Sequence, residues 1–546
     1  MRLTHVDQLN LPFGTLSSYH LEVSPPGEAV PVSFDQQRHV GAGERPGSWM
    51  AISVSMPKVV SCGELERAWL KVIERHGTLR TVFSTGMDGE VQQHRIEISA
   101  GKWVEHPVLP GESINETLRA VLNRQCSPYS RPSHCLCIID AHPRPTVIIG
   151  SDHSHVDMWS MLVIVRDLLA ALDMELPADP PLAFESHTAE LLAAPPAPSQ
   201  IHQRWREILE AGGGKMPRFP LPLGDAISMP ERVEVRDIFG VNGLAIYSAR
   251  ARAKRVSSLA LTISVMAEVT ASLGKLPLRA VFPVHSRFDQ RWHDSVGWFI
   301  TNSVLEVADA DPHTAAQAVR EAVSLGSYPL AEVLEPWGGM PETPGMFAIS
   351  WLDLRRLPVS IDDIGLQAQY VSASLRTDGV MLWFILDRSG AHLRCRYPDS
   401  VEARENVGCW IDAIVARMRA EASTVNLRVG GEQLTLRHGT RADIAEVALL
   451  FAGGLADLCE LEQAFDLLTY ESSHFLAVVR NVRGRVVAAM QLTIVPDFSR
   501  GGALQLLIEG PFIVPEYRAT DLDEKLRTWA VEHGRARGVK IEEVVG

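Results

Sequence analysis

Long apolar segments are missing from this sequence of 546 residues, which has no run of about eighteen or more apolar residues. The sequence therefore predicts no membrane-spanning helix. The first residues, Met1 to Asp7, also lack the apolar core of a signal peptide. We expect a cytoplasmic protein that neither crosses a membrane nor binds one.

Cysteine is scarce, and none of the seven cysteines belongs to a CxxC pair. Their odd number and irregular spacing are typical of reduced thiols and not of a disulfide framework. The seven are Cys62, Cys126, Cys135, Cys137, Cys395, Cys409 and Cys459. This usage also favours a cytoplasmic protein.

Positive charge is in deficit, because 52 Lys and Arg face 66 Asp and Glu and give a net charge of -14. This balance argues against a nucleic-acid partner. The one basic stretch, Arg250-Ala-Arg252-Ala-Lys254-Arg255, is interpreted as a solvated helix face, with a basic binding patch as the alternative. The remaining composition, 46% hydrophobic and 22% charged, is that of a globular protein of about two to four domain-sized units.

The most informative stretch runs from Thr146 to Trp159 and carries two histidines and two aspartates in a polar turn. The β-branched run 147–149 predicts a buried strand, and the apolar segment 159–172 predicts a helix. A turn between such elements can hold an imidazole rigidly at the floor of a cleft, where it could act as a general base. We single out His153 and Asp157.

Two other interpretations of this turn stay open from the residues alone. Polar turn residues often only satisfy backbone groups, and a histidine near a strand end is more often structural than catalytic. The turn also holds four possible metal ligands, Asp152, His153, His155 and Asp157. A metal site is disfavoured, because alternation points neighbouring side chains to opposite faces and no further His/Cys cluster has ligand spacing.

Upstream of the turn, apolar residues at i, i+4, i+7 and i+8 predict a helix from Ser61 to His76. Gly77 is its expected C-cap, and 79–83 begins a strand. Residues 1–30 predict a mostly extended lead-in with one strand at 19–23.

Several motifs in one order resemble those of the condensation-domain superfamily. That superfamily includes the condensation domains of nonribosomal peptide synthetases and the actinobacterial polyketide-associated acyltransferases. The first three motifs are matched by Ser33 to Arg38, by Arg75-His-Gly-Thr-Leu-Arg-Thr-Val-Phe83, and by His153-xxx-Asp157. Phe184-Glu-Ser-His187 is similar to the fourth motif, and Ser295-Val-Gly297-Trp298-Phe299-Ile-Thr-Asn302 to the glycine-aromatic motif near the shared cleft.

Further segments are similar to those of standalone actinobacterial members: Trp205-Arg-Glu-Ile, Gly212 to Gly224, Pro283-Val-His-Ser-Arg287 and Ile349-Ser-Trp-Leu-Asp353. The resemblance covers about residues 25 to 425. It implies an α/β (α+β) fold of two chloramphenicol-acetyltransferase-like lobes in a V, residues 1–180 and 181–428. The histidine turn would lie at their junction, with substrates entering from opposite faces.

The resemblance implies roles for individual residues of the turn, whose family motif is HHxxxDG. His153 matches the second, catalytic histidine. Asp157 matches the aspartate, which in the family forms a structural ion pair with an arginine of the RHxxLR motif, here Arg75 or Arg80. Two positions depart from the motif. Asp152 replaces the first histidine, and Met158 replaces the glycine.

Each departure has an expected consequence. A carboxylate at Asp152 would favour the protonated form of His153 and weaken it as a base. A methionine at 158 adds bulk beside the reacting centre, where glycine permits close approach of a substrate.

The reaction that the resemblance implies is acyl transfer without a tightly bound cofactor. The amine or hydroxyl of a small-molecule acceptor would attack a phosphopantetheine thioester, held on an acyl or peptidyl carrier protein or, alternatively, on free coenzyme A. His153 would remove or position the acceptor's proton, and backbone N–H groups of the turn would stabilise the oxyanion. Gly297, Trp298 and Asn302 are expected at the cleft, although a core aromatic and a turn amide are the plain alternatives for the last two.

The C-terminal part, 429–546, resembles the GNAT acetyltransferase family. Leu434-Thr-Leu-Arg437-His-Gly439-Thr440-Arg-Ala-Asp443 is similar to its first strand and helix start. Segments 475–479, 486–495 and 504–514 predict three further strands, and the apolar face of 522–530 predicts a helix.

The GNAT loop that binds the coenzyme A pyrophosphate reads Q/RxxGxG/A, but here it reads Arg518-Ala-Thr-Asp521-Leu-Asp523. Asp521 and Asp523 stand where glycines belong, and like charges there would oppose a pyrophosphate. The sequence ends at Gly546, before the family's final elements and general-acid tyrosine. We therefore expect a noncatalytic module, with an active acetyltransferase as the alternative.

These observations favour an acyltransferase of specialised, natural-product metabolism that forms an amide or an ester. A noncatalytic scaffold or binding protein is the alternative from another class. It is motivated by Asp152 and Met158 and opposed by the intact Arg75, Arg80, His153 and Asp157.

Overall fold

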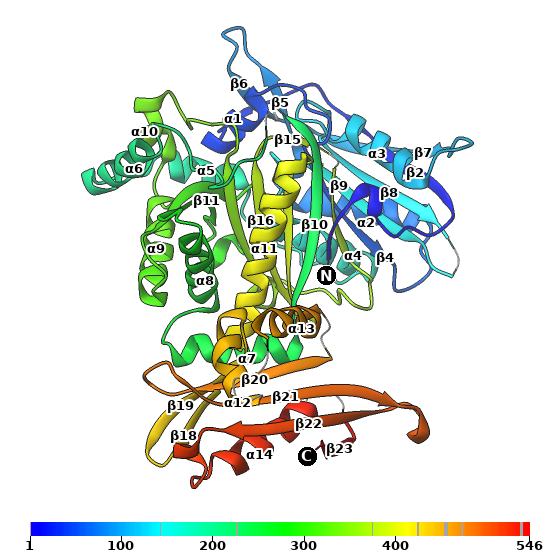
Figure 1. The fold of residues 1–546 in the computed structure, drawn as a ribbon. Coiled ribbons are helices and arrows are strands. Elements are labelled where there is room, and N and C mark those ends of the chain that lie inside the picture. Colours follow the sequence, from blue (N-terminus) through cyan, green and yellow to red (C-terminus); the bar gives the residue numbers. More distant parts are fainter. Residues whose placement is uncertain are drawn as a thin grey trace. The chain divides into compact units, whose positions relative to one another are not determined.

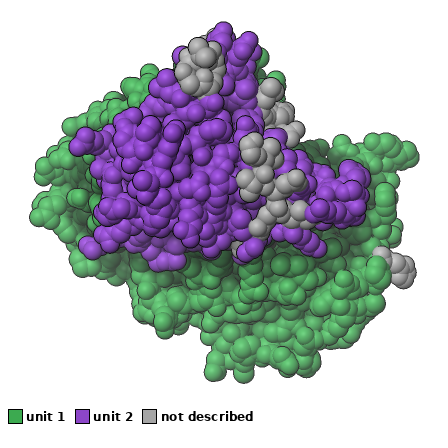
Figure 2. Space-filling model, turned by 60° about the horizontal axis from the view of Figure 1, so that its bottom comes forward, with its two compact units in different colours: residues 1–237, 259–411 green, residues 238–258, 412–546 purple. Residues whose placement is uncertain are grey.

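The structure is a computed structural model that describes residues 2–141, 143–224, 228–373, 375–422, 425–451, 457–470, 473–535 and 539–545 (Figure 1). These form two compact units, which Figure 2 colours separately. Unit 1 comprises Met1–Asp237 and Leu259–Ile411, and unit 2 comprises Ile238–Ser258 and Asp412–Gly546. No helix in the described ranges is long and apolar enough to cross a membrane.

The first sheet of unit 1 has seven strands in the order β1-β14-β4-β9-β8-β2-β7. They are β1 Arg2–His5, β2 Thr15–Val23, β4 Trp49–Ser55, β7 Ile98–His106, β8 His134–Asp140, β9 Thr146–Asp152 and β14 Gln369–Ser372. Strand β9 lies near the middle of the sheet and pairs with β4 and β8 in antiparallel register.

Strand β9 is buried throughout because both faces of its sheet are covered. Val147 and Ile149 belong to one core cluster with helices α2 (Cys62–Arg75) and α4 (Met158–Leu172). Ile148 points the other way, into a second cluster with α3 (Ile114–Gln125). The alternation of a strand thus divides its side chains between two cores.

The second sheet of unit 1 has the order β12-β11-β13-β16-β17-β10-β15. Its strands are β10 Met229–Gly240, β11 Leu278–His285, β12 Ile300–Val307, β13 Phe347–Asp353, β15 Arg376–Thr377, β16 Val380–Asp387 and β17 Gly390–Pro398. Helices α6 (Ser199–Ala211) and α10 (Leu330–Leu334) pack on β11 and β13 in one cluster. Two seven-stranded sheets with covering helices agree with the predicted two-lobe α/β fold.

Strand β14 joins the two halves of unit 1 in a way that the sequence did not predict. It comes from the segment assigned to the second lobe, yet Tyr370 pairs with Ile52 of β4 and with Leu3 of β1 in the first sheet. The division near residue 180 therefore stays a proposal, and it does not hold for β14.

The predicted elements around the histidine turn are confirmed, whereas the N-terminal prediction is wrong in part. Helix α2 begins after the Ser61 cap and ends at Arg75. Gly77 begins a 3-10 turn, Gly77–Arg80, in place of a C-cap. The lead-in contains three strands, β1, the long strand β2 and β3 (Ala29–Val30). Strand β1 could not be predicted because it pairs with β14, far along the chain.

Unit 2 contains a six-stranded sheet in the order β18-β19-β20-β21-β22-β23. The strands are β18 Val425–Val429, β19 Glu432–His438, β20 His474–Arg480, β21 Val486–Asp497, β22 Ala503–Ile513 and β23 Ile541–Val545. Only the pair β22–β23 is parallel within the described register. The three predicted strands and the helix α14 (Leu522–Arg535) are confirmed.

The basic stretch of residues 250–255 lies at the end of α7 (Val241–Ala253) in unit 2. Glu421, which is buried, lies 3.5 Å from Arg250 and 3.2 Å from Lys254. The expectation of a purely solvated face is therefore wrong for these two residues, which form structural ion pairs.

Candidate active site

The histidine turn is fixed at both ends by regular structure. Strand β9 ends at Asp152, and α4 begins at Met158 with Asp157 as its N-cap. The Asp157 carboxylate accepts a hydrogen bond of 2.7 Å from the Ser160 N–H, as a capping aspartate does. The turn therefore has little freedom, and His153 is held within it.

Arg287, which follows β11, clamps Asp157 from the second sheet of unit 1. Its Nη1 donates to Asp157 Oδ2 at 2.5 Å, and both side chains are only 1% exposed. Its Nη2 also donates to Ser160 Oγ at 2.8 Å. Burial by itself would raise the pKa of Asp157, but the charge and hydrogen bonds of Arg287 hold it below the ordinary value. The turn is thereby tied to both lobes.

The prediction that Arg75 or Arg80 pairs with Asp157 is therefore wrong. Arg75 donates instead to Asp167 at 3.0 Å and to the carbonyl of Pro177 at 2.7 Å. The Nε of Arg80 is buried without a hydrogen-bond partner in the described ranges. The motif comparison failed here because an arginine 130 positions away, in the segment 283–287, fills this role.

His153 lies beside two other rings. Its ring centroid is 4.8 Å from that of Trp298 and 6.4 Å from that of His39. The backbone N–H of His153 donates to Ser48 O at 3.1 Å, whereas Nδ1 is buried and has no hydrogen-bond partner among the described residues. Burial, together with the nearby His39, lowers the pKa of His153 from its usual 6.5. Burial thus favours the unprotonated imidazole, the form that can accept a proton.

Asp152 is buried, and its carboxylate is occupied by several donors. Ser48 Oγ and Ser154 Oγ each donate to it at 2.5 Å, and the Ser154 N–H does so at 2.9 Å. Burial alone would raise the pKa of Asp152, but His39 and these hydroxyls lower it. Asp152 does raise the pKa of His153, as expected, but burial and His39 outweigh this effect and the net shift of the histidine is downward.

Met158 and the turn amides also differ from expectation. The side chain of Met158 packs against the core of the first sheet, and its carbonyl accepts from Tyr370 Oη at 2.6 Å. The N–H groups of His153, Ser154 and His155 donate to Ser48 O, Asp152 Oδ1 and Asp152 O. These three amides are therefore not free to stabilise an oxyanion.

The glycine-aromatic segment places one of its three candidate residues directly at the histidine. Trp298 is half-buried beside His153, and its Nε1–H is buried without a hydrogen-bond partner in the described ranges. Gly297 is buried where any Cβ would clash with the ring of Phe184. Asn302 lies on β12 opposite Pro283 of β11, and its role at the cleft stays a prediction.

The four possible metal ligands of the turn do not converge. His155 turns its Nε2 to Thr81 O at 3.2 Å and its Nδ1 to Ser154 Oγ at 3.1 Å. Asp157 is taken by Arg287. In the part of the chain that the structure describes, no group of three His, Cys, Asp or Glu residues could hold a metal ion.

Sequence reasoning missed two residues of the site, Arg287 and His39. Arg287 is the last residue of the segment 283–287, and His39 directly follows the motif Ser33–Arg38. Neither carried a signal that would join it to the turn, because both contacts cross between distant parts of the chain.

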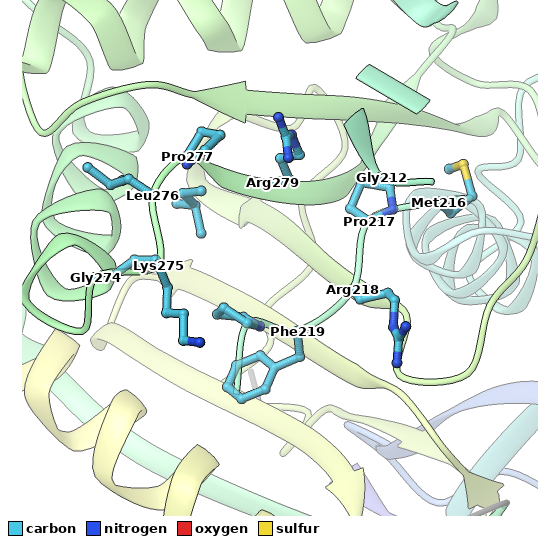
Figure 3. A pocket seen from close by; sticks show the side chains of 13 residues that line it. Gly212, Met216, Pro217, Arg218, Phe219, Gly274, Lys275, Leu276, Pro277 and Arg279 are labelled. Carbon is cyan, nitrogen blue, oxygen red and sulfur yellow. The ribbon is translucent and has the colours of Figure 1, made fainter. Parts of the chain in front are cut away.

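A separate cavity of about 380 Å³ lies elsewhere in unit 1 (Figure 3). Its wall includes Phe219, Lys275 and Arg279, and it contains none of the predicted site residues. Arg279 is paired with Glu306 at 2.5 Å. The cavity lies at the start of β11, whereas Arg287 follows its end, so it does not belong to the histidine turn.

In unit 2, the two aspartates of the expected coenzyme A loop pair with cationic side chains of α14. Asp521 lies 2.5 Å from Lys525, and Asp523 lies 2.9 Å from Arg527, both at i, i+4 spacing. Arg518 donates to the Ile513 carbonyl at 3.0 Å. The carboxylates thus repel an anion less than the sequence suggested, and the case against coenzyme A rests on the missing glycines.

Comparisons with known proteins support the resemblance. No family model matches the chain. Acyltransferase PapA3 of Mycobacterium tuberculosis is 25% identical over 425 residues, which cover 70% of this chain and 87% of the relative. Nonribosomal peptide synthetase NPS2 of Ceriporiopsis subvermispora is 26% identical over 219 residues, or 38% of this chain. The chain spans only 9% of the length of that synthetase.

Two solved structures share the fold. PapA2 acyl transferase matches with a TM-score of 0.67 and 20% identity, covering 77% of this chain and all of that one. The first condensation domain of the calcium-dependent antibiotic synthetase matches with a TM-score of 0.56 and 14% identity, covering 73% and 97%. These likenesses show that the chain shares the fold of condensation domains and related acyltransferases, in agreement with the ordered motifs.

Proposed function

We propose that this protein is an acyltransferase of natural-product metabolism that uses a carrier-protein thioester as donor and a small amine or alcohol as acceptor. The observation that carries the proposal is the state of His153. It is rigidly held, lies beside Trp298, has a lowered pKa, and keeps an unpaired buried Nδ1. These are the properties of a general base that works near neutral pH.

The proposed reaction needs no covalent acyl-enzyme. The acceptor nitrogen or oxygen attacks the thioester carbonyl while His153 takes its proton. The new C–N or C–O bond then stays, the C–S bond breaks, and the thiolate leaves with the proton that His153 returns. A phosphopantetheine thioester supplies the activation, so the protein itself has to position and deprotonate the acceptor.

The oxyanion of the tetrahedral intermediate requires a donor other than the amides of His153, Ser154 and His155, which are already engaged. Trp298 is our candidate, because its unpaired indole N–H belongs to a ring that packs on the His153 ring. A buried donor already in place stabilises developing charge without reorganisation. The roles of Gly297 and Asn302 would be to shape the cleft around this donor.

Mass spectrometry of the products tests the proposal. Wild type, His153→Ala and His313→Ala are each supplied with a panel of acyl carrier-protein thioesters and small amines or alcohols. His313 is an exposed histidine of the same unit and serves as the matched control. We expect transfer by wild type and His313→Ala and a loss of at least about a hundredfold in His153→Ala. Equal transfer by all three would contradict the role of His153.

The scaffold alternative predicts no transfer by wild type with any donor. Free acyl coenzyme A differs only in the carrier of the thioester, and its inclusion in the panel separates the two donors. The intact clamp between Asp157 and Arg287 favours the enzyme, since it holds His153 in a fixed geometry that a scaffold does not require.

A further inference from the structure

A second histidine reaches the turn from helix α1 (Phe34–Gly41). The Nε2 of His39 lies 3.3 Å from Asp152 Oδ1. Its ring centroid is 5.2 Å from that of Trp298, in an edge-on contact, and 6.4 Å from that of His153. The side chain is 14% exposed, so most of this contact is shielded from water. His39 therefore faces the one turn residue that departs in charge from the family motif.

The hydrogen bonds of Arg45 determine which ring nitrogen of His39 carries the proton. Arg45 Nη2 lies 3.1 Å from His39 Nδ1 and also donates to the His39 carbonyl at 2.8 Å. A guanidinium has only donors, so Nδ1 must accept this bond. The ring proton of His39 then resides on Nε2, which is the nitrogen that faces Asp152.

The position of α1 is itself fixed by the turn. Gln36, one helical turn before His39 in the sequence, donates from Nε2 to the Ser154 carbonyl at 2.9 Å in a buried hydrogen bond. Its side-chain oxygen accepts from the Ser33 N–H in a capping box. The contact between His39 and Asp152 therefore belongs to a helix that is anchored on the same turn.

The charges that face His153 come from three elements. Its own turn supplies Asp152 and Asp157, and Arg287 neutralises the latter. Helix α1 supplies His39, with Asp35 and Arg38 3.9 Å apart on the same helix. The glycine-aromatic segment supplies Trp298, which carries no charge. Of the two turn carboxylates, Asp152 raises the pKa of His153 more, against the larger lowering effect of burial.

We propose that His39 is a positioning residue that binds the charge of Asp152 and so keeps His153 free to act as a base. This inference rests on the proposed function. The aspartate that replaces the family's first histidine is tolerated because a histidine from α1 compensates for it. His39 Nε2 lies within ion-pair distance of the Asp152 carboxylate, and two serine hydroxyls donate hydrogen bonds to the same carboxylate.

Opposite changes in the pH profile test this role. The acid limb of kcat/KM against pH reports the pKa of the essential base, and the rate falls as pH drops through it. Asp152→Asn removes a negative charge beside His153, so the limb should move to lower pH. His39→Ala leaves that charge without its partner, so the limb should move to higher pH, by on the order of one pH unit. A role limited to folding would reduce the rate at every pH alike.

Two further variants sharpen the comparison. His39→Gln keeps an N–H donor at the same distance and should keep the limb close to that of wild type. In the Asp152→Asn background, His39→Ala should have a clearly smaller effect than in the wild-type background, because the charge that His39 offsets is gone. His313→Ala, at an exposed histidine of the same unit, is the control and should leave the profile unchanged.

A second measurement needs no substrate. NMR titration of the full chain with labelled histidine follows the His153 ring, assigned through the signal that His153→Gln removes. The expected result is a rise of its pKa in His39→Ala and a fall in Asp152→Asn. Shifts in one direction, or no shift, would overturn the role of His39 even if the enzyme transfers acyl groups. Absence of transfer in wild type would overturn the proposed function while the titration still decides the role of His39.

Should His39→Ala fail to fold, His39→Gln and Asp152→Asn decide the matter by themselves. The proposal then requires that Asp152→Asn lowers the pKa of His153 and that His39→Gln leaves it near the wild-type value. A His153 pKa unchanged in Asp152→Asn would overturn it.

Discussion

Arg287 is the residue on which the geometry of the turn depends most. It is buried and uses its guanidinium on Asp157, on Ser160 and on the Ser295 carbonyl. The guanidinium carbon of Arg287 also lies 3.9 Å from the ring centroid of Phe299, which adds a cation–π interaction. A single side chain thus ties the start of α4 to the glycine-aromatic segment.

Replacement of Arg287 by methionine should destabilise the protein strongly. The change keeps apolar volume but leaves Asp157 as a buried, unpaired charge, at a cost of about 3 to 5 kcal/mol. Chemical denaturation measures the free energy of unfolding. Arg356→Met, at an arginine that is 82% exposed beside Asp353, is the control and should change it by less than about 0.5 kcal/mol. Similar losses in both variants would contradict the clamp.

Trp298→Phe separates the indole N–H from the aromatic ring. The variant keeps a ring against His153 and loses only the donor, so we expect folding to be retained and kcat to fall about 100- to 1000-fold. Thermal unfolding and single-turnover kinetics check the two halves of this expectation. Trp351→Phe, on β13 of the same unit, is the control. An unchanged kcat in Trp298→Phe would remove the indole from the mechanism.

At the scale of elements, three helices of unit 1 begin with the same capping box but differ in what the box holds. The pairs are Ser33 with Gln36, Ser61 with Glu64 and Ser113 with Glu116. Only Gln36 among these three also binds the histidine turn, through the Ser154 carbonyl. The capping box of α1 therefore also holds this helix against the histidine turn, whereas the other two boxes only cap their helices.

Gln36→Ala should cost more than the matched Glu116→Ala. Both variants lose a cap, but Gln36→Ala also leaves a buried carbonyl unpaired, with a penalty of about 1 to 3 kcal/mol. It should also lower acyl transfer, because α1 carries His39 to the turn. Denaturant unfolding and transfer rates of the two variants provide the comparison. Equal effects on both quantities would contradict the anchoring of α1.

At the scale of the whole molecule, unit 2 has a sequence that resembles the GNAT family, but no glycine stands in the segment 514–521 before α14. Strands β22 and β23 run parallel and α14 follows β22, which agrees with the resemblance. The loop before α14 has Asp521 and Asp523, each engaged with a cation one turn later. We propose that this unit does not catalyse acetyl transfer.

Hydrogen–deuterium exchange of the full chain tests this proposal. Acetyl coenzyme A should leave the exchange of residues 514–526 unchanged, since no glycine-rich loop exposes amides to a pyrophosphate there. Protection of that segment would support an acetyltransferase in unit 2. Protection confined to unit 1 would instead favour free acyl coenzyme A as the donor for His153.

The sequence by itself determined the local features, because they depend on neighbours in the chain. The run 147–149 and the helix after the turn follow from apolar periodicity, and α2 follows from its cap and its apolar face. The ordered motifs predicted the superfamily and its two lobes. Asp157 was correctly expected in an ion pair with an arginine, since a buried carboxylate needs a cation.

Only the tertiary structure decided which residues meet at His153. The motif resemblance predicted Trp298 at the cleft, but no periodicity or spacing joins Arg287 or His39 to the turn. The same limit explains the missed strand β1, whose partner β14 lies more than 360 positions later. Side-chain chemistry can be read along a chain, but the pKa of His153 depends on burial and on charges that folding brings within a few ångströms.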